Sequence, residues 1–149
     1  MDDVRKPSQE FNGYFIEDLS VGMTAVFAKT VTEADIVLFA GISGDTNPVH
    51  LNEEYAGTTM FKGRIAHGML SAGFISALLG TKLPGPGCIY MSQNLKFKAP
   101  VRAGDTVVAR GTVTDVNAAK RRVTIQTTCT VGDTVVLDGE ALLMVPTRG

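Results

Sequence analysis

The sequence predicts an α+β fold in which an antiparallel β-sheet curves around one long, apolar central helix. Residues 67–83 are almost wholly apolar or small, so a helix there has almost no polar face and should be buried on most sides. Four strand-like segments follow, joined by turns, at 88–97, 106–115, 122–131 and 134–145. They predict an antiparallel meander, and such a sheet could cover the apolar helix.

The part of the chain before residue 43 predicts an arm, one strand and one short helix. Residues 1–10 are polar and are expected to form a flexible N-terminal arm. Residues 23–31 alternate apolar with small or polar side chains, which is typical of a strand. Thr32 and Asp35 have the spacing of a capping box, and the apolar residues of 36–42 follow at helical spacing. A short helix is therefore expected after Thr32.

A loop is expected after this short helix. The helix should end within residues 41–44 and deliver Asp45 onto a loop, which Asn47 and Pro48 are expected to keep non-helical. Residues 52–56 carry the capping signature of another short helix.

Asp45 and His50 are the candidate acid/base pair. They lie five residues apart on the same loop, and the only other histidine, His67, directly precedes Gly68 at the start of the long helix. The backbone amide of Gly68, at the positive end of that helix, could donate to a developing oxyanion. These three elements, Asp45, His50 and Gly68, suit proton transfer next to a thioester carbonyl. His67 is interpreted only as a helix-start residue.

Plainer interpretations of the same residues stay open. Asp45 could merely stabilise a turn, and His50 could be a hydrogen-bonded core histidine. A metal site made by Asp45, His50 and His67 is the sharpest rival, but no HxH or HxxxH spacing supports it, so no metal is expected. A nucleophilic hydrolase is disfavoured because there is no GxSxG and no cysteine close to a histidine. GxGxxG and P-loop motifs are absent as well.

Composition limits the class of protein. A chain of 149 residues with 44% hydrophobic and 19% charged residues fits one domain, 1–149, with a real core. Fourteen basic against fifteen acidic residues argue against nucleic-acid binding. No apolar stretch has the length of a membrane span, and no secretory signal is visible, so neither a membrane partner nor export is expected. Cys88 and Cys129 have no CxxC spacing, which favours buried free thiols in a reducing cytoplasm, while a disulfide stays open as an alternative that no pattern supports.

Four motifs occur in an order that is typical of one known family. They are Gly44-Asp45-x-Asn47-Pro48-x-His50, His67-Gly68-Met69, Pro84-Gly85-x-Gly87 and Phe97-Lys98-x-Pro100-Val101-x-x-Gly104-Asp105. With these motifs the chain resembles the MaoC-like (R)-specific enoyl-CoA hydratases, from about Gly22 to Val145.

The resemblance implies a hotdog fold and reversible syn hydration of trans-2-enoyl-CoA to (R)-3-hydroxyacyl-CoA. It implies a homodimer with the thioester, borne by CoA or an acyl carrier, at or near the subunit interface, and no cofactor is expected. Asp45 and His50 would be the catalytic pair, Gly68 the oxyanion donor, and Ser76 and Leu79 would lie near the acyl tunnel. A hotdog thioesterase and a non-catalytic acyl-CoA or acyl-carrier binding module stay open as alternatives.

Overall fold

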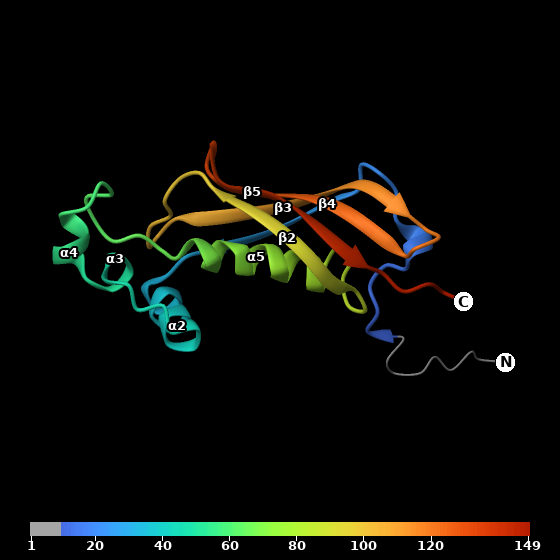
Figure 1. Cartoon of the computed structure of the whole chain (residues 1–149), viewed down its shortest axis with the longest axis horizontal. Helices are drawn as coiled ribbons and strands as arrows, with labels where there is room; N and C mark the ends of the chain where they lie inside the picture. Colours follow the sequence, from blue (N-terminus) through green and yellow to red (C-terminus); the bar gives the residue numbers. More distant parts are fainter. Residues whose placement is uncertain (1–9) are drawn as a thin grey trace.

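One antiparallel sheet curves around one helix in the computed structural model, which describes residues 10–149 (Figure 1). The sheet contains β1 (Thr24–Thr30), β2 (Ile89–Phe97), β3 (Thr106–Asn117), β4 (Arg122–Val131) and β5 (Thr134–Met144). The central helix α5 (Gly68–Thr81) packs mainly against β3 and β1. The α+β prediction and the long apolar helix are therefore confirmed. The arm expected at residues 1–10 lies almost entirely outside the described residues.

The strand order corrects the predicted four-strand meander. The order is β1-β3-β4-β5-β2, so only β3, β4 and β5 follow one another both in sequence and in space. β2 lies at the edge beside β5, in a register that runs from Ile89 opposite Met144 to Phe97 opposite Leu137. The connection from β2 to β3, residues 98–105, therefore crosses the end of the sheet. Crossing three strand spacings covers about 14 Å, which is well within the ~26 Å reach of eight residues.

The helix α2 (Glu33–Ser43) begins and ends where the sequence predicts. The Thr32 hydroxyl accepts from the Asp35 amide at 3.1 Å, and the Asp35 carboxylate accepts from the Thr32 amide at 2.9 Å. The Lys29 ammonium is bonded to the same carboxylate at 2.5 Å and, together with Thr32, lowers the pKa of Asp35. Gly44 ends the helix with a φ of 79°, a left-handed conformation that favours glycine.

The loop after α2 is partly helical, which corrects the expectation about Pro48. Residues Pro48–Leu51 form one turn, α3, and Glu53–Gly57 form α4 as predicted. Pro48 occupies the first position of α3, where its missing N–H costs no hydrogen bond. The Asn47 side chain caps the turn by accepting from the Val49 amide at 3.1 Å. The helices α2, α3 and α4 gather beyond the N-terminal end of α5 (Figure 1).

Only one side of α5 is buried in the single chain, so the prediction of burial on most sides is wrong for this chain alone. The side that faces the sheet carries Phe74, Ile75, Leu78 and Leu79, all of which are buried. The open side is exposed and carries Met69, Gly73, Ser76 and Gly80. The five strands cover only one side of the helix. Because α5 carries apolar or small residues on all sides, its composition does not reveal which side stays open.

Two further expectations concern membranes and thiols. Within residues 10–149, no helix is both long and apolar enough to cross a bilayer. Both cysteines are free, as predicted, but only Cys129 is fully buried, whereas Cys88 is half-buried. Burial raises the pKa of the Cys129 thiol to about 12.

Candidate active site

The loop that carries Asp45 and His50 is tied to the segment just before α5. The Ile65 amide donates to the Val49 carbonyl at 3.2 Å. His50 Nδ1–H donates to the Ile65 carbonyl at 2.8 Å, and His67 Nε2–H donates to the Asp45 carbonyl at 2.9 Å. These three bonds join parts of the chain that are far apart in the sequence. They bring Asp45, His50 and the start of α5 to one place.

Asp45 and His50 face each other across a short gap. Asp45 Oδ2 lies 3.9 Å from His50 Nε2, which is too long for a direct hydrogen bond. The Asp45 side chain is 51% exposed, whereas that of His50 is 10% exposed. Because the Ile65 carbonyl can only accept, the proton of neutral His50 lies on Nδ1 and its Nε2 carries the lone pair. Both groups could therefore bond to one water molecule between them.

Gly68 is the first residue of α5, and among residues 10–149 its backbone amide has no hydrogen-bond acceptor. The first N–H groups of a helix have no partner within the helix, and the preceding residue, His67, makes no side-chain cap bond. A Cβ atom on residue 68 would lie 2.5 Å from the ring of Phe97, so glycine lets this ring pack directly against the helix start. Because it belongs to the first residue of α5, the Gly68 amide lies at the positive end of the helix, where anions are stabilised.

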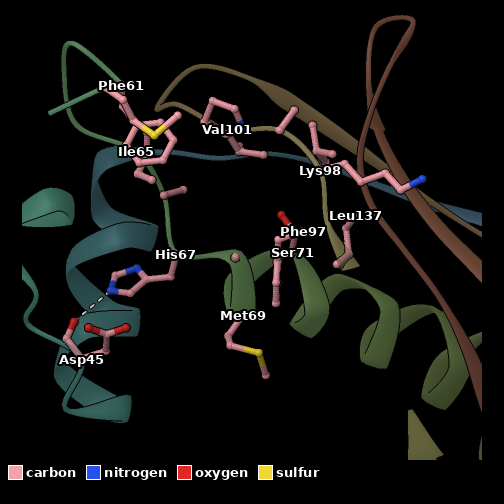
Figure 2. Close-up of a pocket in the computed structure, with 16 residues that line it drawn as sticks. Asp45, Phe61, Ile65, His67, Met69, Ser71, Phe97, Lys98, Val101 and Leu137 are labelled. Atoms are coloured by element: carbon pink, nitrogen blue, oxygen red, sulfur yellow. Dashed lines mark hydrogen bonds between the residues drawn. The ribbon is translucent and has the colours of Figure 1, made fainter. Parts of the chain in front are cut away.

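A cavity of about 440 Å³ opens between the start of α5 and the end of β2 (Figure 2). Asp45, His67 and Gly68 contribute to its wall. The ring of His50 stacks on that of His67, and His50 is not part of the lining. Most of the other lining side chains are apolar and include Phe61, Ile65, Met69, Phe97, Val101 and Leu137. An apolar cavity of this size with a few polar groups at one end suits a small acyl ligand.

The two predicted acyl-tunnel residues lie outside this cavity lining. Ser76 is exposed on the open side of α5, and Leu79 is fully buried in the core beneath the sheet. Ser71, which precedes Ser76 on α5, does line the cavity. The roles of Ser76 and Leu79 therefore stay predictions from the resemblance.

Asp45, His50 and His67 are close enough together to be considered as metal ligands. One donor atom from each lies within 4.8 Å of the others. However, the two imidazole rings are stacked, with centroids 3.8 Å apart and planes at 30°. Nitrogen lone pairs lie in the ring planes, so in this stack they run side by side and do not converge on one ion. His67 Nε2 is also engaged with the Asp45 carbonyl. The arrangement therefore does not favour a shared ion.

Sequence reasoning missed several residues of the site. It gave His67 no role beyond starting the helix, yet His67 lines the cavity and holds the Asp45 carbonyl. Phe97, Lys98 and Val101 also line the cavity. These three belong to a motif that supported the family resemblance but suggested no function. The signal for His67 was its place beside Gly68 in a chain with only two histidines.

The chain is similar in sequence and in structure to known hydratases and dehydratases. The family model of the MaoC like domain matches residues 20–136. An (R)-specific enoyl-CoA hydratase from Rhodospirillum rubrum is 64% identical over 136 residues, which cover 91% of this chain and 94% of the relative. A 3-hydroxybutyryl-CoA dehydratase from Methylorubrum extorquens is 51% identical, with 93% and 88% covered. The solved structure of an unliganded R-hydratase from Pseudomonas aeruginosa has a TM-score of 0.86 and 44% identity, with 92% of this chain and 88% of that chain covered. The predicted hotdog fold is thereby confirmed.

Proposed function

The chain belongs to the MaoC-like family, and from that premise we propose that it catalyses the reversible syn hydration of trans-2-enoyl-CoA to (R)-3-hydroxyacyl-CoA. Relatives named as hydratases and as a dehydratase describe the two directions of this hydro-lyase reaction. One observation carries the assignment of residues. The Asp45 carboxylate and His50 Nε2 face each other at 3.9 Å, and Asp45 lines the same cavity as Gly68, the first residue of α5.

In the proposed reaction, Asp45 and His50 act as one acid/base pair. They hold a water molecule, whose oxygen forms a bond to the β-carbon of the enoyl group. One proton passes from the water to the pair, and one proton passes from the pair to the α-carbon. The protonation of the pair is therefore unchanged after each turnover. Because oxygen and proton come from the same side, the addition is syn. General acid/base help of this kind is worth ~10²–10⁴ in rate.

Gly68 supplies the electrostatic part of the reaction. When oxygen adds to the β-carbon, negative charge develops on the thioester oxygen. The Gly68 amide, at the positive end of α5, donates to that oxygen. A donor that is held in place for a developing oxyanion typically lowers the barrier by roughly 3 kcal/mol.

The substrate is proposed to be a CoA thioester, because the relatives cited above are named as CoA enzymes. Its enoyl group would bind in the apolar cavity, with the thioester at the Asp45 and Gly68 end. Ser76 and Leu79 are retained as proposed contacts of longer acyl chains. Asp45, His50 and Gly68 need no cofactor for this chemistry.

We also propose that the active form is a homodimer of one-domain chains, 1–149, in the cytoplasm. β2 is an edge strand whose exposed apolar side chains include Ile89, Met91 and Phe97. Exposed apolar edges of this kind are normally paired or covered. A second copy related by a two-fold axis would cover both this edge and the open side of α5. The two free thiols suit a reducing compartment.

The experiment that tests the function is to incubate the protein with crotonyl-CoA. We expect the enoyl absorbance to fall without release of free thiol. Release of free thiol would instead indicate a thioesterase. Binding of crotonyl-CoA without any chemical change would indicate a binding module. Either of these last two results would overturn the proposal.

A further inference from the structure

His67 is a buried histidine to which the proposed reaction gives no task. Its side chain lies between the rings of Phe39 and His50, with centroid distances of 4.8 Å and 3.8 Å, and the residue is only 2% exposed. Its Nδ1 atom has no hydrogen-bond partner among residues 10–149. A buried polar atom without a partner destabilises a protein. A phenylalanine would therefore suit this place between two rings, except that it could not donate a hydrogen bond.

The hydrogen bond that histidine adds goes to Asp45. His67 Nε2–H donates to the Asp45 backbone carbonyl at 2.9 Å, as Figure 2 shows. Because a carbonyl only accepts, the proton of neutral His67 lies on Nε2, and Nδ1 is the atom left without a partner. His50 has the opposite tautomer, with its proton on Nδ1. Each histidine thus binds a carbonyl of the segment that carries the other.

His67 is also the neighbour in sequence of the proposed oxyanion donor, the Gly68 amide. His67 is the N-cap residue of α5, so it directly precedes the Gly68 amide. N-cap side chains usually bond to the first amides of their helix. The His67 side chain makes no such bond and reaches the Asp45 loop instead. One residue therefore links the carboxylate segment to the oxyanion donor.

The other bonds of Asp45 join it to residues only two positions away in the sequence. Its amide donates to the Ser43 hydroxyl at 3.1 Å, and its carboxylate accepts from the Asn47 amide at 3.2 Å. Neither bond reaches α5. The Asp45 side chain is also half exposed, so packing does not fix it.

On these observations, and on the basis of the proposed function, we infer that His67 is a positioning residue that sets the distance between the Asp45 carboxylate and the Gly68 amide. It acts through its Nε2–H bond to the Asp45 carbonyl and does not itself exchange protons with the substrate. Misplacing a reactive group by about 1 Å can cost on the order of 10² in rate. Loss of this bond should therefore lower kcat more than it raises KM.

Two substitutions separate the hydrogen bond from the packing. His67→Phe keeps a ring between Phe39 and His50 but removes the donor, whereas His67→Gln keeps an N–H donor of similar reach. With crotonyl-CoA, we expect His67→Phe to lower kcat by about 10- to 100-fold with KM within about threefold. His67→Gln should retain kcat within about fivefold of the wild type. Phe39→Leu, which alters the packing of His67 but leaves its hydrogen bond, is the matched control and should stay within about threefold.

Two kinetic results would overturn the inference. One is a folded His67→Phe variant with kcat within about twofold of the wild type. The other is a His67→Gln variant no better than His67→Phe, since the ring and not the donor would then matter. Thermal melting of all three variants shows whether lost activity reflects lost folding.

A spectroscopic measurement tests the bond without relying on turnover or on a variant that folds. Nitrogen NMR of the wild-type imidazoles should show His67 protonated on Nε2 and His50 protonated on Nδ1. A proton on Nδ1 of His67 would contradict the inference. If the wild type does not hydrate crotonyl-CoA, the proposed function fails, while the tautomer still decides whether His67 holds Asp45.

Discussion

Truncation of Leu79 tests whether the acyl chain extends along α5. Leu79 follows Gly68 by eleven positions, which is three turns and about 16 Å along the helix, on the same face. Helical side chains lean toward the N-terminal end, so the isobutyl group of Leu79 leans back toward Gly68. An acyl chain that starts at the Gly68 amide and follows this face would approach Leu79 only when it is long. Leu79→Ala should therefore favour longer substrates.

The structure also determines what this truncation costs in stability. Leu79 is 0% exposed, so the variant loses three buried carbons and leaves a cavity. At about 0.8 kcal/mol for each carbon plus a cavity contribution, the free energy of unfolding should fall by about 3 kcal/mol. For a domain of this size, that loss lowers the melting temperature by roughly 6–12 °C. Each additional methylene that the new space accommodates should raise relative kcat/KM about fourfold.

The assay measures kcat/KM for C4, C6 and C8 enoyl-CoA together with thermal melting. Leu78→Ala is the matched control, because Leu78 has the same size and burial but faces about 100° away around the helix. We expect similar melting temperatures for the two variants and a raised C8-to-C4 ratio only for Leu79→Ala. An unchanged ratio in Leu79→Ala would refute the reasoning, whatever happens to stability.

Three further predictions follow from the site and from the cap of α2. Asp45→Asn and His50→Gln should each lower kcat by ~10²–10⁴ with unchanged circular dichroism, and near-normal turnover in either variant would contradict the assignment. Gly68→Ala should lower kcat, since the new Cβ would meet Phe97 at 2.5 Å, and a crystal structure of the variant should show that ring displaced. Asp35→Ala should lower the free energy of unfolding by about 1 kcal/mol near pH 7, because it removes the carboxylate that accepts from the Thr32 amide at the start of α2. Because folding depresses the pKa of Asp35, its contribution is present above the ordinary value of 3.8 and disappears as pH falls through the lower folded value. Denaturant titrations should therefore show the wild type and variant converging in acid.

Short-range patterns were enough to predict the fold class, but not the arrangement of the strands. The apolar run of α5 and the alternation in β2 are properties of neighbouring residues, so each was visible in the sequence. The pairing of β2 with β5 depends on a connection that crosses the sheet, and the alternation in β2 fits either neighbour. Likewise, the composition of α5 shows that it is apolar, but not that only one side would meet the sheet.

The proposed reactive groups are easier to identify from the sequence than the contacts that hold them. Asp45, His50 and Gly68 were predicted from residue type and spacing, and the structure brings them together at the start of α5. The bond from His67 to the Asp45 carbonyl joins residues 22 positions apart, and no local pattern encodes it. The packing of Phe97 on Gly68 spans a still longer separation. Long-range contacts of this kind depend on the tertiary structure. This explains why the sequence suggests a role for Gly68 but none for its neighbour Phe97.

The edge strand β2 provides the test of the proposed dimer. Met91 is 44% exposed on this edge, so a lysine there should be harmless in an isolated chain. In a dimer that pairs the two β2 edges, the same lysine would lie within the interface, where a buried charge is costly. We expect the wild type to sediment as a dimer at micromolar concentration and Met91→Lys to shift toward monomer with an unchanged fold. Val21→Lys, at an exposed apolar residue in the turn before β1, is the control and should remain dimeric. A wild type that is monomeric and fully active at micromolar concentration would show that this edge needs no second copy.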